Sequence, residues 1–212
     1  MPAADLAALS ALVLTATFAL AFAFGAIVQR TNFCTMGGVA DIVNFGDWTR
    51  MRQWLLAIAV AVGGTTLIDV AGLIDISASY YTSTRFTPLA YVVGGLMFGF
   101  GMVLVGGCGS KSLVRAGAGS LKSLVVLLVL AVVAYMTLRG ALALVRVGVL
   151  ERVGVTLSSR QDLPSLLATT TGARTAWHLG LGLTLAALLA AFALRDRAFL
   201  TFDNLLAGLG IG

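Results

Sequence analysis

The sequence has few charged residues: Asp, Glu, Lys and Arg make up 11% of its 212 positions, whereas soluble domains have about a quarter. Hydrophobic residues make up 59%, and the mean hydropathy is +0.99. This composition excludes an ordinary soluble domain and predicts an integral membrane protein. The formal net charge of +5 does not indicate a nucleic-acid-binding protein, because the sequence has no Lys/Arg-rich run of about five to eight residues.

Cysteine and histidine are also scarce, with two Cys and one His in the chain. No C-x-x-C motif is present, and neither cysteine has a carboxylate or histidine beside it. The single His178 follows Trp177, a pattern typical of a membrane interface. A Walker A phosphate loop is excluded, because Ser110 stands between Gly109 and Lys111, where that motif requires glycine directly before lysine. We therefore expect no enzyme, no metal and no cofactor.

Long apolar runs dominate the rest of the chain, and each is long enough to span a bilayer. The residues before the first run contain no basic residue, which favours a retained helix over a signal peptide. The glycine pairs Gly63–Gly64 and Gly95/Gly99 are expected at close helix contacts. We predict an all-α polytopic membrane protein with about five transmembrane helices, over 6–28, 54–73, 87–105, 121–145 and 175–194.

Two polar, glycine-containing segments interrupt this pattern, Gln29–Asp41 after the first run and Gly106–Ser112 after the third. Lipid cannot satisfy free backbone N–H and C=O groups, so irregular backbone beside the bilayer must face protein or a watery cavity. Each segment is too short for a domain and too polar to span. We predict a short re-entrant half-helix in each, one containing Cys34 and the other Cys108.

An internal repeat connects the two segments. Phe24-Gly25 precedes Cys34 at the same spacing as Phe98-Gly99 precedes Cys108, and the order of span, cysteine, polar turn and span recurs. Repeats around a site of broken helices are the architecture of secondary transporters. We therefore divide the chain into a first unit (1–75), a second unit (76–146), a polar or interfacial connection (147–174), and a fifth span with the start of a further apolar segment (175–212).

The motifs QRTNFCTMGG (29–38) and FGFGMVLVGGCGS (98–110) resemble those of the YeeE/YedE family of sulfur-compound transporters. The resemblance implies an hourglass of transmembrane helices with half-helices meeting at its centre. It also implies inward transport of thiosulfate across the bacterial cytoplasmic membrane, and a cytoplasmic sulfur-carrier protein as partner. Cys34 and Cys108 match the two cysteines of the first half of a full-length member. We expect this chain to correspond to that first half plus one span.

The chemistry of thiosulfate fits this segment pair. A dianion leaves water only where polar groups replace its hydration shell, and a thiol is a weak donor. We expect apolar surroundings to keep both thiols protonated and half-helix N-termini to favour the anion. Arg30 and Lys111 either attract anions or anchor the chain at the interface. The candidate pathway residues are Cys34, Cys108, Gly37, Gly38, Gly106, Gly107, Gly109 and Ser110.

Two alternatives stay open: a membrane thiol-redox protein, and a non-transporting half-subunit of a larger transporter. The apolar segment from Thr201 does not complete a span, which predicts pairing with a second copy or a complementary half. The exact sulfur or selenium anion is left open. The positive-inside rule predicts an N-terminus outside the cytoplasm, from Arg50, Arg52, Arg115, Lys122, Arg195 and Arg197.

Overall fold

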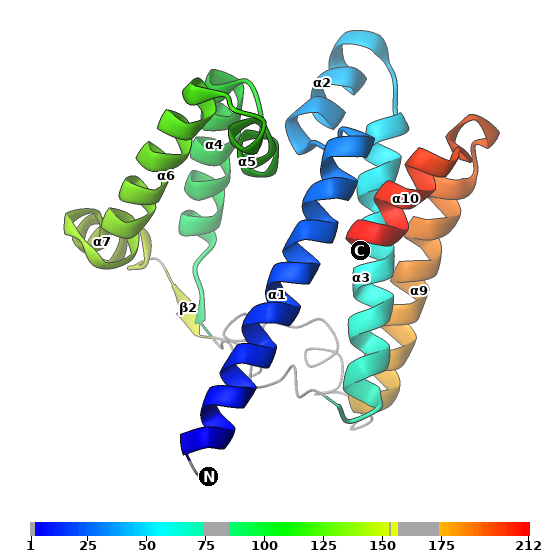
Figure 1. Cartoon of the computed structure of the whole chain (residues 1–212), viewed down its shortest axis with the longest axis horizontal. Helices are drawn as coiled ribbons and strands as arrows, with labels where there is room; N and C mark the ends of the chain where they lie inside the picture. The colour runs from blue at the N-terminus through cyan, green and yellow to red at the C-terminus, as the bar shows by residue number, and fades with distance from the viewer. Residues whose placement is uncertain (1–2, 74–84, 153, 157–173) are drawn as a thin grey trace.

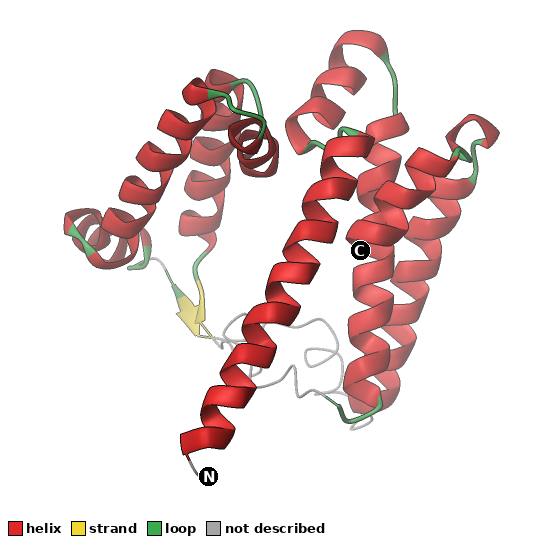
Figure 2. Ribbon diagram, viewed as in Figure 1, coloured by secondary structure: helices red, strands yellow, loops and turns green. Residues whose placement is uncertain are grey.

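The structure is a computed structural model that describes residues 3–73, 85–152, 154–156 and 174–212, and it is almost entirely helical (Figure 1, Figure 2). Among these residues, five segments are long and apolar enough to cross a membrane. The predicted all-α polytopic fold is therefore confirmed. The long helices are α1 (Ala3–Thr31), α3 (Thr49–Val70), α4 (Pro88–Val105), α6 (Leu121–Arg139) and α9 (Arg174–Leu194).

Two short helices follow α1 and α4, where the sequence predicts half-helices. They are α2 (Thr35–Phe45) and α5 (Gly109–Gly117). The chain ends in η4 (Arg197–Phe199) and α10 (Phe202–Ile211), so the apolar segment after Thr201 is itself a short helix. Small extra elements are α7 (Ala141–Val145), the π-helix η3 (Arg146–Leu150), and the strands β1 (Arg85–Phe86) and β2 (Val155–Thr156), which pair antiparallel.

The fourth span is present but shorter than the predicted 121–145. The helix α6 ends at Arg139, and Gly140 has an extended backbone (φ −103°, ψ −160°) before α7 begins. A Cβ at position 140 would lie 2.8 Å from the Cα of Met136, so only glycine fits this tight break. The polar connection predicted over 147–174 includes η3 and β2, but residues 157–173 of it lie outside the described residues.

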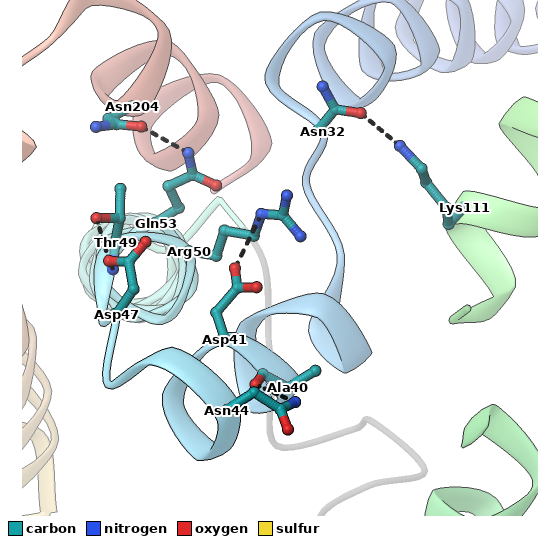
Figure 3. Close-up of polar contacts among 10 residues, drawn as sticks. All are labelled: Asn32, Ala40, Asp41, Asn44, Asp47, Thr49, Arg50, Gln53, Lys111 and Asn204. Atoms are coloured by element: carbon teal, nitrogen blue, oxygen red, sulfur yellow. Dashed lines mark hydrogen bonds and ion pairs between the residues drawn. The ribbon is translucent and has the colours of Figure 1, made fainter. Parts of the chain in front are cut away.

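The second span is displaced from its predicted position over 54–73, because α3 begins at Thr49 and ends at Val70. Asp47 prepares this start, since its carboxylate accepts hydrogen bonds from the Thr49 hydroxyl at 2.6 Å and from the Thr49 N–H at 2.9 Å (Figure 3). These bonds hold the pKa of Asp47 below its ordinary value. Polar residues before the apolar run therefore form the first turn of α3.

The helices form two groups (Figure 1). One contains α1, α3, α9 and α10, with α2 folded back onto the start of α3. The other contains α4, α5 and α6, and it meets the first group mainly where α5 contacts α1. The outer faces of α4 and α6 are strongly apolar, with Leu96 71% and Leu128 60% exposed in the isolated chain. Such faces suit lipid or another apolar protein surface.

A small apolar core lies beside the point where the groups meet. The buried residues Val28, Phe33, Ala57 and Ala207 pack with Trp54, Val114 and Ile211, from α1, α3, α5 and α10. The ring of Phe33 stacks on that of Trp54 with centroids 5.2 Å apart. Because Phe33 directly precedes Cys34 and Val114 lies on the helix that follows Cys108, this core positions both cysteines.

Candidate functional site

Each cysteine is the residue directly before a short helix. Cys34 is the N-cap of α2 and Cys108 is the N-cap of α5, both with extended backbone. The helices before them end at Thr31 and Val105, so the same interval of 74 residues that separates the cysteines also separates these helix ends. The two segments therefore repeat one local geometry: a long helix, a short break, a cysteine and a short helix.

The two thiols lie side by side. Their Sγ atoms are 3.6 Å apart, within hydrogen-bond distance for sulfur, and both residues are buried, with 6% and 7% of their surfaces exposed. Both cysteines are free thiols. The fold thus brings together two residues far apart in the sequence, one from each helix group.

Backbone N–H groups surround the sulfur of Cys34. Those of Met36, Gly37 and Cys108 are close enough to interact with it, and its own thiol donates to the Sγ atom of Cys108. Neither α2 nor α5 has an acidic residue in its first turn or a side-chain cap on its N-terminal amides. Free helix N-terminal amides favour negative charge. The Cys34 sulfur is therefore buried and also has backbone donors beside it.

A polar contact joins the two groups next to the thiols. The Nζ atom of Lys111 donates to Oδ1 of Asn32 at 2.6 Å (Figure 3). Asn32 has a positive φ of 52°, the left-handed conformation that lets α1 stop and the chain turn into α2. Asparagine tolerates this conformation better than most residues. Lys111 lies in the first turn of α5, so its charge stands near the helix start that follows Cys108.

The predicted glycines have different roles in the structure. A Cβ at Gly37 would lie 2.5 Å from Nη1 of Arg50, and one at Gly38 would lie 3.5 Å from the backbone N of Met51. At Gly37 the close atom is the flexible end of a side chain, and at Gly38 the distance is an ordinary contact, so both glycines lie where α2 faces the start of α3. Gly107 is buried beside Lys111.

The remaining residues of the second segment border Cys108. Gly106 ends α4 with φ +71°, and Gly109 and Ser110 are the first two residues of α5. A Cβ at Gly109 would meet no atom within 4 Å. The backbone after Cys108 is therefore open on this side.

Arg30 is paired in the structure. Its Nε atom lies 2.9 Å from Oδ1 of Asp203, and its guanidinium lies 5.4 Å from the ring centroid of Phe202. The carboxylate of α10 offsets the charge of Arg30. Its suggested role in attracting anions stays a prediction.

Sequence reasoning missed three residues that support the site. Asn32 makes the contact to Lys111. Arg50 lies against Gly37 and forms an ion pair with Asp41 (Nε–Oδ2 3.2 Å; Figure 3). Arg115 donates from Nη1 to the carbonyl of Gly106 at 3.1 Å. The position of Asn32 directly before Phe33-Cys34 was the one available signal, since asparagine is favoured where a helix stops with positive φ.

Metal chemistry has no support in the part of the chain that the structure describes, where no group of three or more His, Cys, Asp or Glu side chains is placed to hold an ion.

Comparison with known families gives a match over most of the chain. A family model described as "Sulphur transport" matches residues 30–207, a range that includes both cysteines and every helix from α2 to α9. The chain belongs to this sulphur transport family, the YeeE/YedE family. The resemblance of the two cysteine motifs is thereby confirmed.

Two curated members of the family are similar to part of this chain. The "Thiosulfate transporter TsuA" of Escherichia coli (strain K12) is 35% identical over 103 residues, which cover 49% of this chain and 28% of that protein. The "Thiosulfate transporter TsuA" of Spirochaeta thermophila is 28% identical over 120 residues, covering 57% of this chain and 35% of that protein. The chain therefore matches about a third of the length of these relatives.

Proposed function

We propose that this chain is a membrane transporter, not an enzyme, and that it moves thiosulfate or a closely related small sulfur anion into the cytoplasm along a path lined by Cys34 and Cys108. One observation carries the proposal: two buried thiols, 3.6 Å apart, each directly before the uncapped N-terminus of a short helix. Both relatives are named thiosulfate transporters, which supports the proposal.

The donors at the pair fit a small dianion. The amides directed at Cys34 and the free amides at the start of α5 replace part of the anion's hydration shell without a fixed counter-charge. A thiol is a weak donor, and a transport site must release what it binds. Sulfur donors also match the soft terminal sulfur of thiosulfate better than an oxygen of sulfate.

The neighbouring residues have supporting roles in this proposal. Gly106, Gly107, Gly109 and Ser110 expose backbone beside Cys108. Gly37 and Gly38 lie where α2 faces the start of α3, on the helix that follows Cys34. Lys111 places a positive charge near the path. The duplicated unit, 1–75 and 76–146, brings the two cysteines to equivalent positions in the path.

We also propose a membrane, an orientation and partners for the chain. Arg50, Arg52, Arg115, Lys122, Arg195 and Arg197 lie at the end of the helices where α2 and α5 start. By the positive-inside rule this end faces the cytoplasm of a bacterial inner membrane, with the N-terminus outside. The exposed faces of α4 and α6 suit a second copy or a complementary half. A cytoplasmic sulfur-carrier protein would receive the sulfur.

Growth of a bacterium lacking its own sulfate and thiosulfate uptake tests the proposal. The chain is expressed alone and together with the complementary half of a full-length relative, with thiosulfate, sulfite or sulfide as the sulfur source. We expect thiosulfate to support growth, and Cys108→Ala or Cys34→Ala to lower labelled-thiosulfate uptake about tenfold, the effect of one lost hydrogen bond of roughly 1.4 kcal/mol.

The control is Thr184→Ala, because the Thr184 hydroxyl bonds only to backbone carbonyls within α9. This variant should retain full uptake. Equal growth of the cysteine variants and the parent, at matched abundance in the membrane, would contradict the proposed path.

A further inference from the structure

The two thiols are close enough for chemistry beyond hydrogen bonding. A disulfide requires an S–S distance of about 2.0 Å, so the 3.6 Å between the Sγ atoms leaves roughly 1.5 Å to close. Gly106, Gly107 and Gly109 flank Cys108, and a Cβ at Gly106 or Gly109 would meet no atom within 4 Å, so no packed side chain at these two positions opposes a small movement. Both cysteines are buried, so a reagent must be small to reach them.

The two sulfurs differ in their surroundings. The amides of Met36, Gly37 and Cys108 are directed at the Cys34 sulfur, and such donors stabilise a thiolate, which is the nucleophilic form of cysteine. Cys108 lies within reach as the second thiol. This is the arrangement of an attacking and a resolving cysteine in thiol–disulfide exchange.

We propose that Cys34 and Cys108 are a redox-active dithiol that polythionates oxidise to a disulfide, with thiosulfate as the leaving group. Polythionates are sulfur chains ending in sulfonate groups, and tetrathionate is the member made of two thiosulfate units. The choice of this oxidant rests on the proposed function, since a polythionate presents to a thiosulfate path the same terminal S–SO₃⁻ unit that thiosulfate has. The formation of the disulfide rests on the geometry of the two thiols alone.

The reaction balances in two steps. The Cys34 thiolate attacks an inner sulfur of tetrathionate; the central S–S bond breaks, one thiosulfate leaves, and Cys34 carries an S–SO₃⁻ group. The Cys108 thiolate then attacks the Cys34 sulfur, forming the protein disulfide and expelling the second thiosulfate. The thiols lose two electrons and two protons in total, tetrathionate gains the two electrons, and the protons go to solvent.

The disulfide has a structural consequence. It ties the start of α2 to the start of α5, and so links the two helix groups covalently at the place where α5 meets α1. It also removes both thiol donors from the proposed path. Oxidation should therefore stop uptake until a thiol reductant restores the pair.

The test uses the purified full chain in detergent, treated with tetrathionate. Peptide mass spectrometry without reduction should show one Cys34–Cys108 linked peptide, complete loss of free thiols, and release of two thiosulfates per chain. Dithiothreitol should return both thiols. In Cys108→Ser, Cys34 should retain the S–SO₃⁻ group and release a single thiosulfate. In Cys34→Ser, adduct formation on Cys108 should be at least tenfold slower than on Cys34.

Separate adducts on both cysteines, linkage only between chains, or unreacted thiols would each overturn the inference. The rate at which the thiols react, compared before and after denaturation, shows whether a variant has failed to fold. A misfolded chain reacts as fast as the denatured one. A linked peptide formed by a chain that takes up no thiosulfate would support the dithiol and count against the proposed function. Thiosulfate uptake without linkage would overturn the dithiol alone.

Discussion

At the scale of single residues, Asn32 combines two tasks that the sequence alone does not separate. Its backbone takes the left-handed conformation at φ +52° between α1 and α2, and its side chain accepts a hydrogen bond from Lys111 on the other helix group. The first task depends on backbone sterics and the second on the amide. Different substitutions therefore distinguish them.

Asn32→Gly and Asn32→Ala both remove the contact to Lys111, but only glycine adopts a positive φ without cost. The left-handed conformation costs other residues about 1–2 kcal/mol, while glycine loses about 0.5–1 kcal/mol through greater chain entropy in the unfolded state. Asn32→Ala should therefore be less stable than Asn32→Gly by about 0.5–1 kcal/mol, measured by denaturant unfolding in detergent. Equal stability of the two variants would show that the backbone conformation is not strained.

The site was partly predictable at this scale. Cys34 and Cys108 stood out because each lies in a polar, glycine-containing break after an apolar run. Both occupy the N-cap position of a short helix in the structure. Arg50 and Arg115 were not recognisable as site residues, because their contacts to Gly37 and Gly106 arise only when the short helices fold back. Half-helix N-termini near the thiols were predicted, but which backbone N–H groups approach the Cys34 sulfur was not, because every residue except proline has such a group.

At the scale of helices, hydropathy predicted the spans well but glycine patterns did not predict the contacts. A Cβ at Gly63 would meet Ala186 at 3.5 Å, an ordinary contact, whereas Gly64, Gly95 and Gly99 face open space in the described structure. The close approach of α3 and α9 instead involves Gly182, where a Cβ would overlap the Thr66 hydroxyl and lie 3.1 Å from the Thr66 Cβ. A glycine motif does not specify which helix will lie against it.

Gly182→Ala should destabilise the chain by about 1–3 kcal/mol, because the added methyl group overpacks the contact between α3 and α9. Unfolding in detergent, followed by circular dichroism, measures the effect. Gly180→Ala on the same helix is the matched control, since a Cβ there meets no atom within 4 Å, and it should be neutral or slightly stabilising.

A second variant tests the cause of that effect. Thr66→Ala removes the hydroxyl and methyl groups that the new side chain would meet. The double variant Gly182→Ala/Thr66→Ala should therefore recover part of the lost stability. No recovery, or an equal loss in Gly180→Ala, would mean that the contact is not tight.

At the scale of the whole molecule, composition predicted the class and the resemblance predicted the family. The break at Gly140 was not predicted, because apolar residues continue on both sides of Arg139 and Gly140, and hydropathy does not register a single extended glycine. The internal repeat predicted that the two cysteine segments are equivalent, but it did not predict which helices meet. The contact between α1 and α5 joins segments distant in the sequence. The cysteine pair at this meeting point is the feature on which the account depends.

The uptake of sulfur-35-labelled thiosulfate into proteoliposomes tests that account most directly. The chain is reconstituted with a complementary family half, as the parent and as Cys34→Ala/Cys108→Ala, at equal protein content. We predict that the parent takes up thiosulfate faster than sulfate, and that the double variant is more than about tenfold slower with thiosulfate, since each lost donor contributes roughly 1.4 kcal/mol. Equal thiosulfate uptake by the parent and the double variant would contradict it.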